Sequence, residues 1–131
     1  METNFKFNNS ILVKPEDLNP ADKLFGGRAL EHIDEKAALF AYCQLRYPDV
    51  VVTKLMSEIN FVSSASKGDI VEFGFRTIGV GRTSITIECL VRNKTTNEKI
   101  IHIDKIVFVN VDKDTLTPKP HGLTIETICK S

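Results

Sequence analysis

The sequence predicts an α+β domain in which one long helix lies against an antiparallel β-sheet. Two observations support this prediction: residues 28–47 contain neither Gly nor Pro, and four strand-like segments joined by short turns follow them. The chain has 131 residues, which is enough for one domain and short for two. Hydrophobic residues make up 42% and charged residues 26%, an ordinary globular composition that argues against disorder.

The N-terminal third is expected to supply a short edge strand and then the helix. The apolar triplet Ile11–Val13, followed closely by Pro15, is consistent with an edge strand. The glycine pair Gly26-Gly27 opens the helical segment Arg28–Tyr47, which Pro48 ends. One stripe at helical spacing collects Leu30, Ile33, Ala37, Phe40, Ala41 and Gln44. This stripe is the face that we expect to pack against the sheet.

The strand-like segments come next and form two consecutive hairpins. They are Val50–Val62, the alternating stretch around Val71–Phe75, the stretch around Ile85–Val91, and Ile100–Val111. In the first, one face is expected to carry Val51, Thr53, Leu55, Ser57, Ile59 and Phe61. Turns are expected at 67–69, at Gly79 and Gly81, and at 94–98. After Pro118 the pattern is weak, and the residues able to pack are Leu123, Ile125 and Ile128.

Charge and cysteine usage narrow the class of protein. Seventeen basic and seventeen acidic residues give a net charge of zero, which argues against a nucleic-acid partner. The three cysteines lie far apart in the sequence, at Cys43, Cys89 and Cys129, and form no CxxC motif. We therefore expect them to be buried reduced thiols. Met1–Ser10 has no apolar signal region, and no apolar run approaches the roughly 18 residues of a membrane span. The expected protein is cytoplasmic, without a membrane span.

Several catalytic and binding motifs are absent. The sequence contains no P-loop, no GxSxG and no HExxH. His32, His102 and His121 are scattered, so no metal site is predicted. Gly79-Val80-Gly81 is half of a dinucleotide-binding motif, but no helix follows it, and we interpret these glycines as turn residues.

Two features remain as candidates for chemistry. Asp34 lies at the margin of the apolar stripe, where a partly desolvated carboxylate suits a general base or a nucleophile. The alternative is an exposed boundary acid paired with a lysine. Gly26-Gly27 at a helix N-terminus leaves backbone N–H groups open to an oxyanion, or else forms only a tight turn. Asn19, before Pro20, is by itself a turn residue.

The stretch Asn19–Asp34, NPADKLFGGRALEHID, resembles the opening of hotdog-fold acyl-CoA thioesterases, the family that includes the YciA-like enzymes. Their pattern is an Asn, a short loop, a Gly-Gly pair, and an Asp seven residues after the second Gly. The resemblance continues at 67–69, at Gly81–Ser84 and at Val107–Asp112, and it covers about residues 10–115. It implies a hotdog fold, a long central helix wrapped by a curved antiparallel sheet. Residues 1–131 would be one domain with a core of about 10–115 and a tail of about 118–131.

The resemblance also implies roles for individual residues. Asp34 matches the catalytic acid, which activates water or attacks the thioester directly, and Asn19 matches the residue that orients water or substrate. Gly27 and Arg28 would polarise the thioester oxygen through their backbone N–H groups. The residues expected to contact coenzyme A are Gly81, Arg82, Thr83, Ser84 and Arg28. Coenzyme A is part of the acyl-CoA substrate, so no separate cofactor is implied.

The same resemblance implies a homo-oligomer. In this family two subunits pair to make a continuous sheet, each site takes Asn19 from one chain and Asp34 from the other, and hexamers are trimers of dimers. The rival function is a non-catalytic acyl-CoA-binding or sensor module, which would also keep the 81–84 segment. A hotdog hydratase is less favoured, because no short motif combines an Asp and a His. Asp22 and Arg28 depart from many relatives and leave the acyl preference open.

Overall fold

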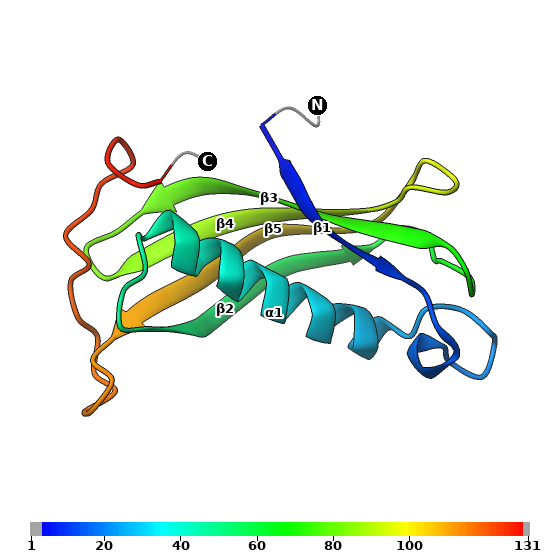
Figure 1. Cartoon of the computed structure of the whole chain (residues 1–131), viewed down its shortest axis with the longest axis horizontal. Helices are drawn as coiled ribbons and strands as arrows, with labels where there is room; N and C mark the ends of the chain where they lie inside the picture. Colours follow the sequence, from blue (N-terminus) through cyan, green and yellow to red (C-terminus); the bar gives the residue numbers. More distant parts are fainter. Residues whose placement is uncertain (1–3, 130–131) are drawn as a thin grey trace.

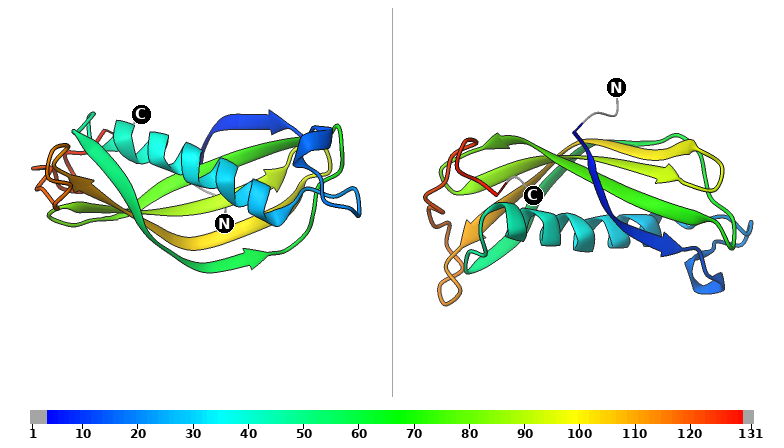
Figure 2. Two further views of the ribbon diagram at one scale, coloured as in Figure 1. Left: turned by 90° about the horizontal axis from the view of Figure 1, so that it is seen from below. Right: turned by 45° about the horizontal axis from the view of Figure 1, so that its top comes forward.

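In the computed structural model, which describes residues 4–129, five strands form one antiparallel sheet and a single long helix lies along one of its faces (Figure 1). The elements in chain order are β1 (Lys6–Leu12), the short 3-10 turn η1 (Pro15–Asp17), α1 (Gly26–Gln44), β2 (Val50–Phe61), β3 (Ile70–Val80), β4 (Ser84–Asn93) and β5 (Glu98–Val111). The strand order is β1-β3-β4-β5-β2. The sheet twists and curves around α1 (Figure 2), as the sequence predicts.

The core forms where the apolar stripe of α1 meets the inner face of the sheet. On the helix, the buried residues are Ala29, Ile33, Ala37, Ala41 and Gln44, with Leu30 and Phe40 half-buried beside them. The sheet contributes Val71, Phe73, Phe75, Ile85, Ile87, Cys89, Val91, Ile101, Ile103, Ile106 and Phe108. The stripe predicted from helical spacing is therefore the face that packs against the sheet, because burying it removes most of the apolar surface of the helix from water.

The ends of α1 differ from the prediction of Arg28–Tyr47. The helix begins at Gly26, because Phe25 is the N-cap and its carbonyl accepts the first helical hydrogen bond from the N–H of Ala29, at 2.9 Å. It ends at Gln44, because Arg46 and Tyr47 take left-handed backbone angles, with φ of 59° and 61°. The glycine pair is thus inside the first turn of the helix rather than in front of it.

The alternation predicted for β2 is wrong in its middle. A register shift against β5 lies between Thr53 and Leu55, so the extra residue Lys54 reverses which side chains face the core. Met56 packs against the core, whereas Leu55 is 43% exposed. Thr53 stays on the inner side because it precedes the shift. A bulge of this kind depends on the pairing partner and leaves no mark on the sequence of β2.

Two other strand predictions also need correction. β1 begins at Lys6 rather than at Ile11, because backbone pairing with β3 extends the edge strand through polar residues that alternate between sheet and solvent. Gly79 is not a turn residue: it lies within β3 at a register irregularity, and the chain reverses after it, at 81–83. The predicted turn at Gly81 is confirmed, since its N–H donates to the carbonyl of Ser84 at 3.0 Å.

The expectation of three buried thiols is wrong for two of them. Cys89 is fully buried between sheet and helix, and burial raises the pKa of its thiol strongly. Cys43 is exposed, because it lies on the solvent side of α1, and Cys129 is half-buried. Within residues 4–129 no helix combines the length and the hydrophobicity that crossing a bilayer requires. The single-domain organisation and the cytoplasmic location stay predictions.

The tail after Pro118 returns to the body of the molecule. Ile128 is buried and Leu123 packs against the core, whereas Ile125 is exposed. The N–H of Cys129 donates to the carbonyl of Gln44 at 2.9 Å, which ties the tail to the end of α1.

Candidate active site

Asp34 projects from the middle of α1 toward the edge strand β2. The hydroxyl of Thr53 on β2 donates a hydrogen bond of 2.6 Å to Oδ1 of Asp34. The Asp34 side chain is half-buried, and no ion pair to it is present in the part of the chain that the structure describes. A carboxylate held by one hydroxyl and open to water on its other side retains lone pairs for a proton or an electrophile. The alternative of a boundary acid paired with a lysine is not what the structure contains.

Thr53 is a functional candidate that sequence reasoning missed. Threonine is common in strands, so its occurrence in β2 gives no hint of a function. Its hydrogen bond to Asp34 forms only because pairing with β5 places β2 beside α1. The one available signal was its place on the face of β2 that was predicted to turn inward, toward the helix that carries Asp34.

The N-terminus of α1 offers unpaired donors beside two aromatic rings. The first helical hydrogen bond is made by Ala29, and within residues 4–129 the N–H groups of Gly26, Gly27 and residue 28 have no acceptor. A Cβ at Gly27 would lie 3.1 Å from the ring of Phe25, and one at Gly26 would lie 3.3 Å from the ring of Phe61. The glycines therefore let the two rings pack closely against the first turn of α1, where the helix dipole favours negative charge.

Asn19 is fixed by the loop that precedes α1. Its Oδ1 accepts the N–H groups of Ala21 at 2.9 Å and of Lys23 at 3.1 Å, which is the turn role expected of an Asn in this setting. Its Nδ2 has no acceptor in the described part of the chain. Asn19 lines a hollow of about 550 Å³, together with Lys23, Ser66 and Lys67. The turn therefore holds the amide through its oxygen, and among the described residues the N–H₂ group has no acceptor.

The two arginines of the predicted coenzyme A contact have different surroundings. Nε of Arg28 lies 2.7 Å from Oδ1 of Asp17, and Nη1 lies 2.7 Å from Oε1 of Glu31. These carboxylates raise the pKa of the Arg28 guanidinium. Arg82 is exposed, and its side chain has no partner among the described residues. Of the two, Arg82 has the cation more open to an anionic ligand.

The loop Gly81–Ser84 is held in place by the tail and β5. The carbonyl of Arg82 accepts the N–H of His121 at 3.3 Å, and the carbonyl of Ser84 accepts Nε2–H of the same histidine at 3.0 Å. The carbonyl of Thr83 accepts the N–H of Asn110 at 2.7 Å. The tail that looked weakly patterned in the sequence thus orders the loop predicted to contact coenzyme A.

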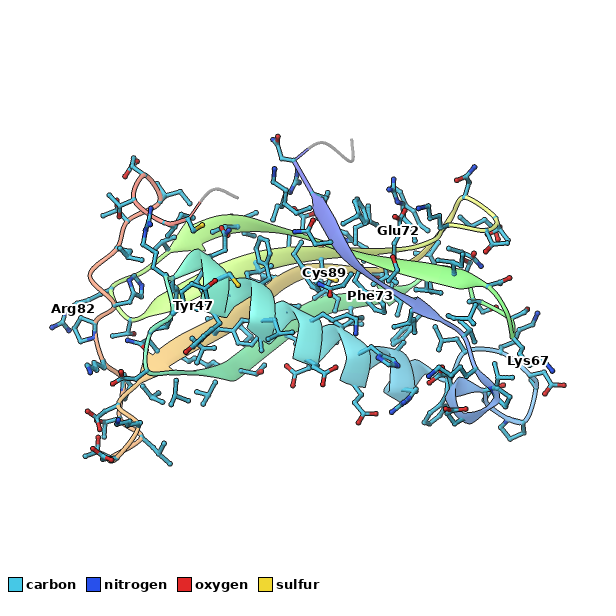
Figure 3. The ribbon with its side chains drawn as sticks, in the orientation of Figure 1. Tyr47, Lys67, Glu72, Phe73, Arg82 and Cys89 are labelled. Atoms are coloured by element: carbon cyan, nitrogen blue, oxygen red, sulfur yellow. The ribbon has the colours of Figure 1, made fainter. Side chains whose placement is uncertain are left out.

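One chain does not bring all the predicted residues together. Arg82 and Lys67 lie at opposite ends of the long axis of the molecule (Figure 3), and Asn19 lines the same hollow as Lys67. Gly27 and Asp34 are seven residues apart on α1, which is about 10 Å along the axis at 1.5 Å per residue. Asn19 and the helix N-terminus thus share one end, Asp34 lies between, and 81–84 lies at the other end.

Comparison with known proteins decides the family. The model of the thioesterase superfamily matches residues 22–100, which is more than half of the chain. The chain belongs to the thioesterase superfamily. No curated protein sequence matches this thioesterase-superfamily chain.

Solved structures agree with that assignment. A hexameric acyl-CoA thioesterase is 33% identical, with 91% of this chain and 76% of that chain covered and a TM-score of 0.73. A hexameric hotdog-fold thioesterase of Campylobacter jejuni is 27% identical, covers 90% and 91% of the two chains and has a TM-score of 0.76. An acyl-CoA hydrolase from Staphylococcus aureus, solved with butyryl coenzyme A and coenzyme A, is 25% identical, covers 89% and 68%, and has a TM-score of 0.74.

These findings confirm the predicted hotdog fold and the predicted class, a thioesterase-superfamily enzyme that hydrolyses thioesters. The narrower YciA-like assignment and the individual site residues stay predictions. Among residues 4–129 no group of three or more His, Cys, Asp or Glu side chains is arranged to hold a metal ion.

Proposed function

We propose that this thioesterase-superfamily chain hydrolyses acyl-CoA thioesters to a free acid and coenzyme A. The observation that carries the proposal is the 2.6 Å hydrogen bond from Thr53 to Asp34, which orients an open carboxylate on a rigid helix. The open helix N-terminus at Gly27 and the free amide of Asn19 supply donors for a thioester oxygen. The coenzyme A bound in the Staphylococcus aureus relative supports the choice of substrate class.

In the proposed reaction, Asp34 takes a proton from a water molecule as the water oxygen attacks the thioester carbonyl carbon. The carbonyl oxygen becomes an oxyanion that the N–H groups of Gly27 and Arg28 stabilise. Collapse of this intermediate breaks the C–S bond, and the departing sulfur receives the proton held by Asp34. The same carboxylate can instead attack the carbonyl carbon, which breaks the C–S bond, expels coenzyme A as its thiolate and forms a mixed anhydride. Water then cleaves the anhydride to the free acid and Asp34, and a proton released in that step converts the thiolate to the thiol. Thr53 keeps one carboxylate oxygen fixed in both routes.

We further propose that each site is shared by two chains. A carbonyl held at Gly27 lies about 10 Å along the axis from Asp34 of the same chain, whereas reacting atoms must approach to roughly 3–3.5 Å. β2 is an edge strand of 12 residues, with Val52 and Leu55 exposed on it. Pairing of β2 with β2 of a second copy would bring Asp34 of one chain to Asn19 and Gly27 of the other. Several of the solved relatives are hexamers, which supports an assembly of such dimers.

For the coenzyme A moiety, we propose contacts with the ordered loop Gly81–Ser84, with Arg82 as the cation that meets the phosphates. This loop is preorganised by His121 and Asn110, which lowers the cost of ordering it on binding. Arg28 was predicted to contribute as well, but its guanidinium is already held by two carboxylates.

The decisive experiment measures thiol released from a panel of acyl-CoAs by the wild type and by Asp34→Ala. The wild type should hydrolyse at least one substrate, and removal of the acid should lower the rate on the order of hundreds-fold. Equal background rates for both proteins on every substrate would end the proposal. Tight coenzyme A binding without thiol release would instead favour a binding module. A sizing measurement tests the shared site, since a stable active monomer contradicts it.

A further inference from the structure

Asp17 is a buried carboxylate at the junction of η1 and α1. Its side chain is 4% exposed, and Nε of Arg28 donates to its Oδ1 at 2.7 Å. Its Oδ2 accepts the N–H of Lys14 at 3.0 Å, and its backbone carbonyl accepts the N–H of Phe25 at 2.8 Å. One residue therefore contacts the segment before η1, the N-cap of α1 and the first turn of α1.

The partners of Asp17 keep it charged although it is buried. Burial by itself raises the pKa of this carboxyl, but the hydrogen bonds from Arg28 and from the Lys14 backbone, together with the nearby His32 ring, outweigh burial and hold the pKa below its usual value. Nε2 of His32, one turn after Arg28, lies 3.6 Å from Oδ1, and the His32 ring packs near the ring of Phe73 in the core. The charged cluster is thus anchored to the body of the sheet.

These contacts close the base of the loop that carries Asn19. The N–H of Phe25 bonds back to Asp17 across the loop, and inside it the N–H of Asn19 donates to the carbonyl of Lys23 at 2.8 Å. The Asp17 side chain adds the bond to Arg28, whose own backbone N–H is one of the open donors of the helix N-terminus. The Asp17–Arg28 ion pair is therefore the side-chain link that joins the base of the Asn19 loop to the first turn of α1, beside the backbone hydrogen bonds that shape the loop.

We propose that Asp17 is a positioning residue for thioester hydrolysis, which acts through Arg28 to hold the Asn19 amide in register with the backbone donors at Gly27 and Arg28. The inference rests on the proposed function. It applies to one half of the shared site, because Asn19, Gly27 and Arg28 belong to the same chain. A displacement of the loop by about 1 Å is enough to lower a rate by about a hundredfold.

This role differs from the prediction that the Arg28 guanidinium binds coenzyme A. A cation that binds phosphates raises KM when it is removed, because it contributes mainly to ground-state binding. Removal of a guanidinium that positions the donors lowers kcat instead, because the donors act on the oxyanion of the transition state. The split between kcat and KM therefore separates the two roles of Arg28.

The experiment measures kcat and KM on the best acyl-CoA substrate for Asp17→Asn, Arg28→Gln and the double variant, as full-length oligomers. Glu72→Gln is the matched control: Glu72 is 13% exposed and pairs with Arg92 at 2.8 Å on the face of the sheet opposite α1. Each single variant should lose about tenfold to a hundredfold in kcat, with KM within about twofold. The double variant should be no slower than the slower single variant, since both changes break one contact. The control should keep wild-type kcat and KM.

Four results would overturn the inference. They are a folded Asp17→Asn with kcat within twofold of wild type, a rise in KM alone for Arg28→Gln, fully multiplicative losses in the double variant, and an equal loss of kcat in Glu72→Gln. If Asp17→Asn does not fold, Arg28→Gln carries the test alone. A wild type that releases no thiol contradicts the proposed function as well, whereas an active wild type, an inactive Asp34→Ala and a fast Asp17→Asn contradict only this inference.

Discussion

Thr53→Val removes the hydroxyl that donates to Oδ1 of Asp34 at 2.6 Å and keeps the volume and the β-branching of the side chain. A hydrogen bond to a charged acceptor contributes about 1.5–3 kcal/mol, and we expect the lower end here because Thr53 is exposed to water. About 1.4 kcal/mol corresponds to a tenfold change in rate. We therefore expect kcat for acyl-CoA hydrolysis to fall about tenfold, with the carboxylate still present but no longer held.

The assay follows thiol release under saturating acyl-CoA for the wild type, Thr53→Val and Thr53→Ser. The serine variant keeps a hydroxyl and should recover most of the rate. Thr77→Val is the matched control, because the hydroxyl of Thr77 donates to Oε1 of Gln44 at 2.7 Å, a bond of the same kind away from Asp34. It should lower the free energy of unfolding by about 1 kcal/mol and leave kcat unchanged.

A Thr53→Val variant that is folded and assembled like the wild type and retains the wild-type kcat would show that Thr53 does not orient Asp34. A Thr77→Val variant that slows the reaction as much as Thr53→Val does would contradict that role as well. In the second case the lost rate reflects a general loosening of the sheet rather than orientation of Asp34.

Three further predictions concern stability and reactivity. Ile33 is 0% exposed between helix and sheet, so Ile33→Ala leaves a cavity there, and urea titration should show that the free energy of unfolding falls by about 2–5 kcal/mol. A decrease below about 1 kcal/mol would contradict this packing. Burial raises the pKa of Glu88, but hydrogen bonds led by that from His102 leave it below its ordinary value of 4.5. Its contribution to stability is therefore full above pH 4.5 and is lost as the pH falls further, so the difference in unfolding free energy between the wild type and Glu88→Gln should shrink there. A thiol reagent followed by mass spectrometry should modify exposed Cys43 in the native protein and buried Cys89 only after denaturation, and equal rates would contradict these positions.

Helical and strand periodicity made much of the fold predictable from local sequence. The stripe that includes Ile33 and Ala37 is spaced so that a single helix face is apolar, and that face is buried whatever the neighbouring strands do. Regular alternation made β4 predictable in the same way, with Ile85, Ile87 and Cys89 all on the core side. The bulge at Lys54 was not predictable, because it arises from how β2 pairs with β5.

The candidate site likewise contains residues that the sequence indicated and residues that only the structure identified. The stretch from Asn19 through Gly27 to Asp34 lies close together in the chain, and its resemblance to hotdog thioesterases indicated the enzyme class and the candidate residues on α1. Asp17, by contrast, was an unmarked residue in a turn, and its ion pair with Arg28 exists only because η1 folds back onto the helix.

The sequence by itself therefore predicted most of the elements, resembled the family to which the chain belongs and indicated Asp34 as the candidate acid, because periodicity, turns and motif spacing are encoded within a few residues of each other. Only the tertiary structure decided that Thr53 holds Asp34 and that Asp17 closes the Asn19 loop. It also decided that the loop 81–84 lies at the end of the molecule opposite the Asn19 loop. Those contacts join residues distant in sequence, and strand register, which only the assembled sheet defines, sets which side chains meet.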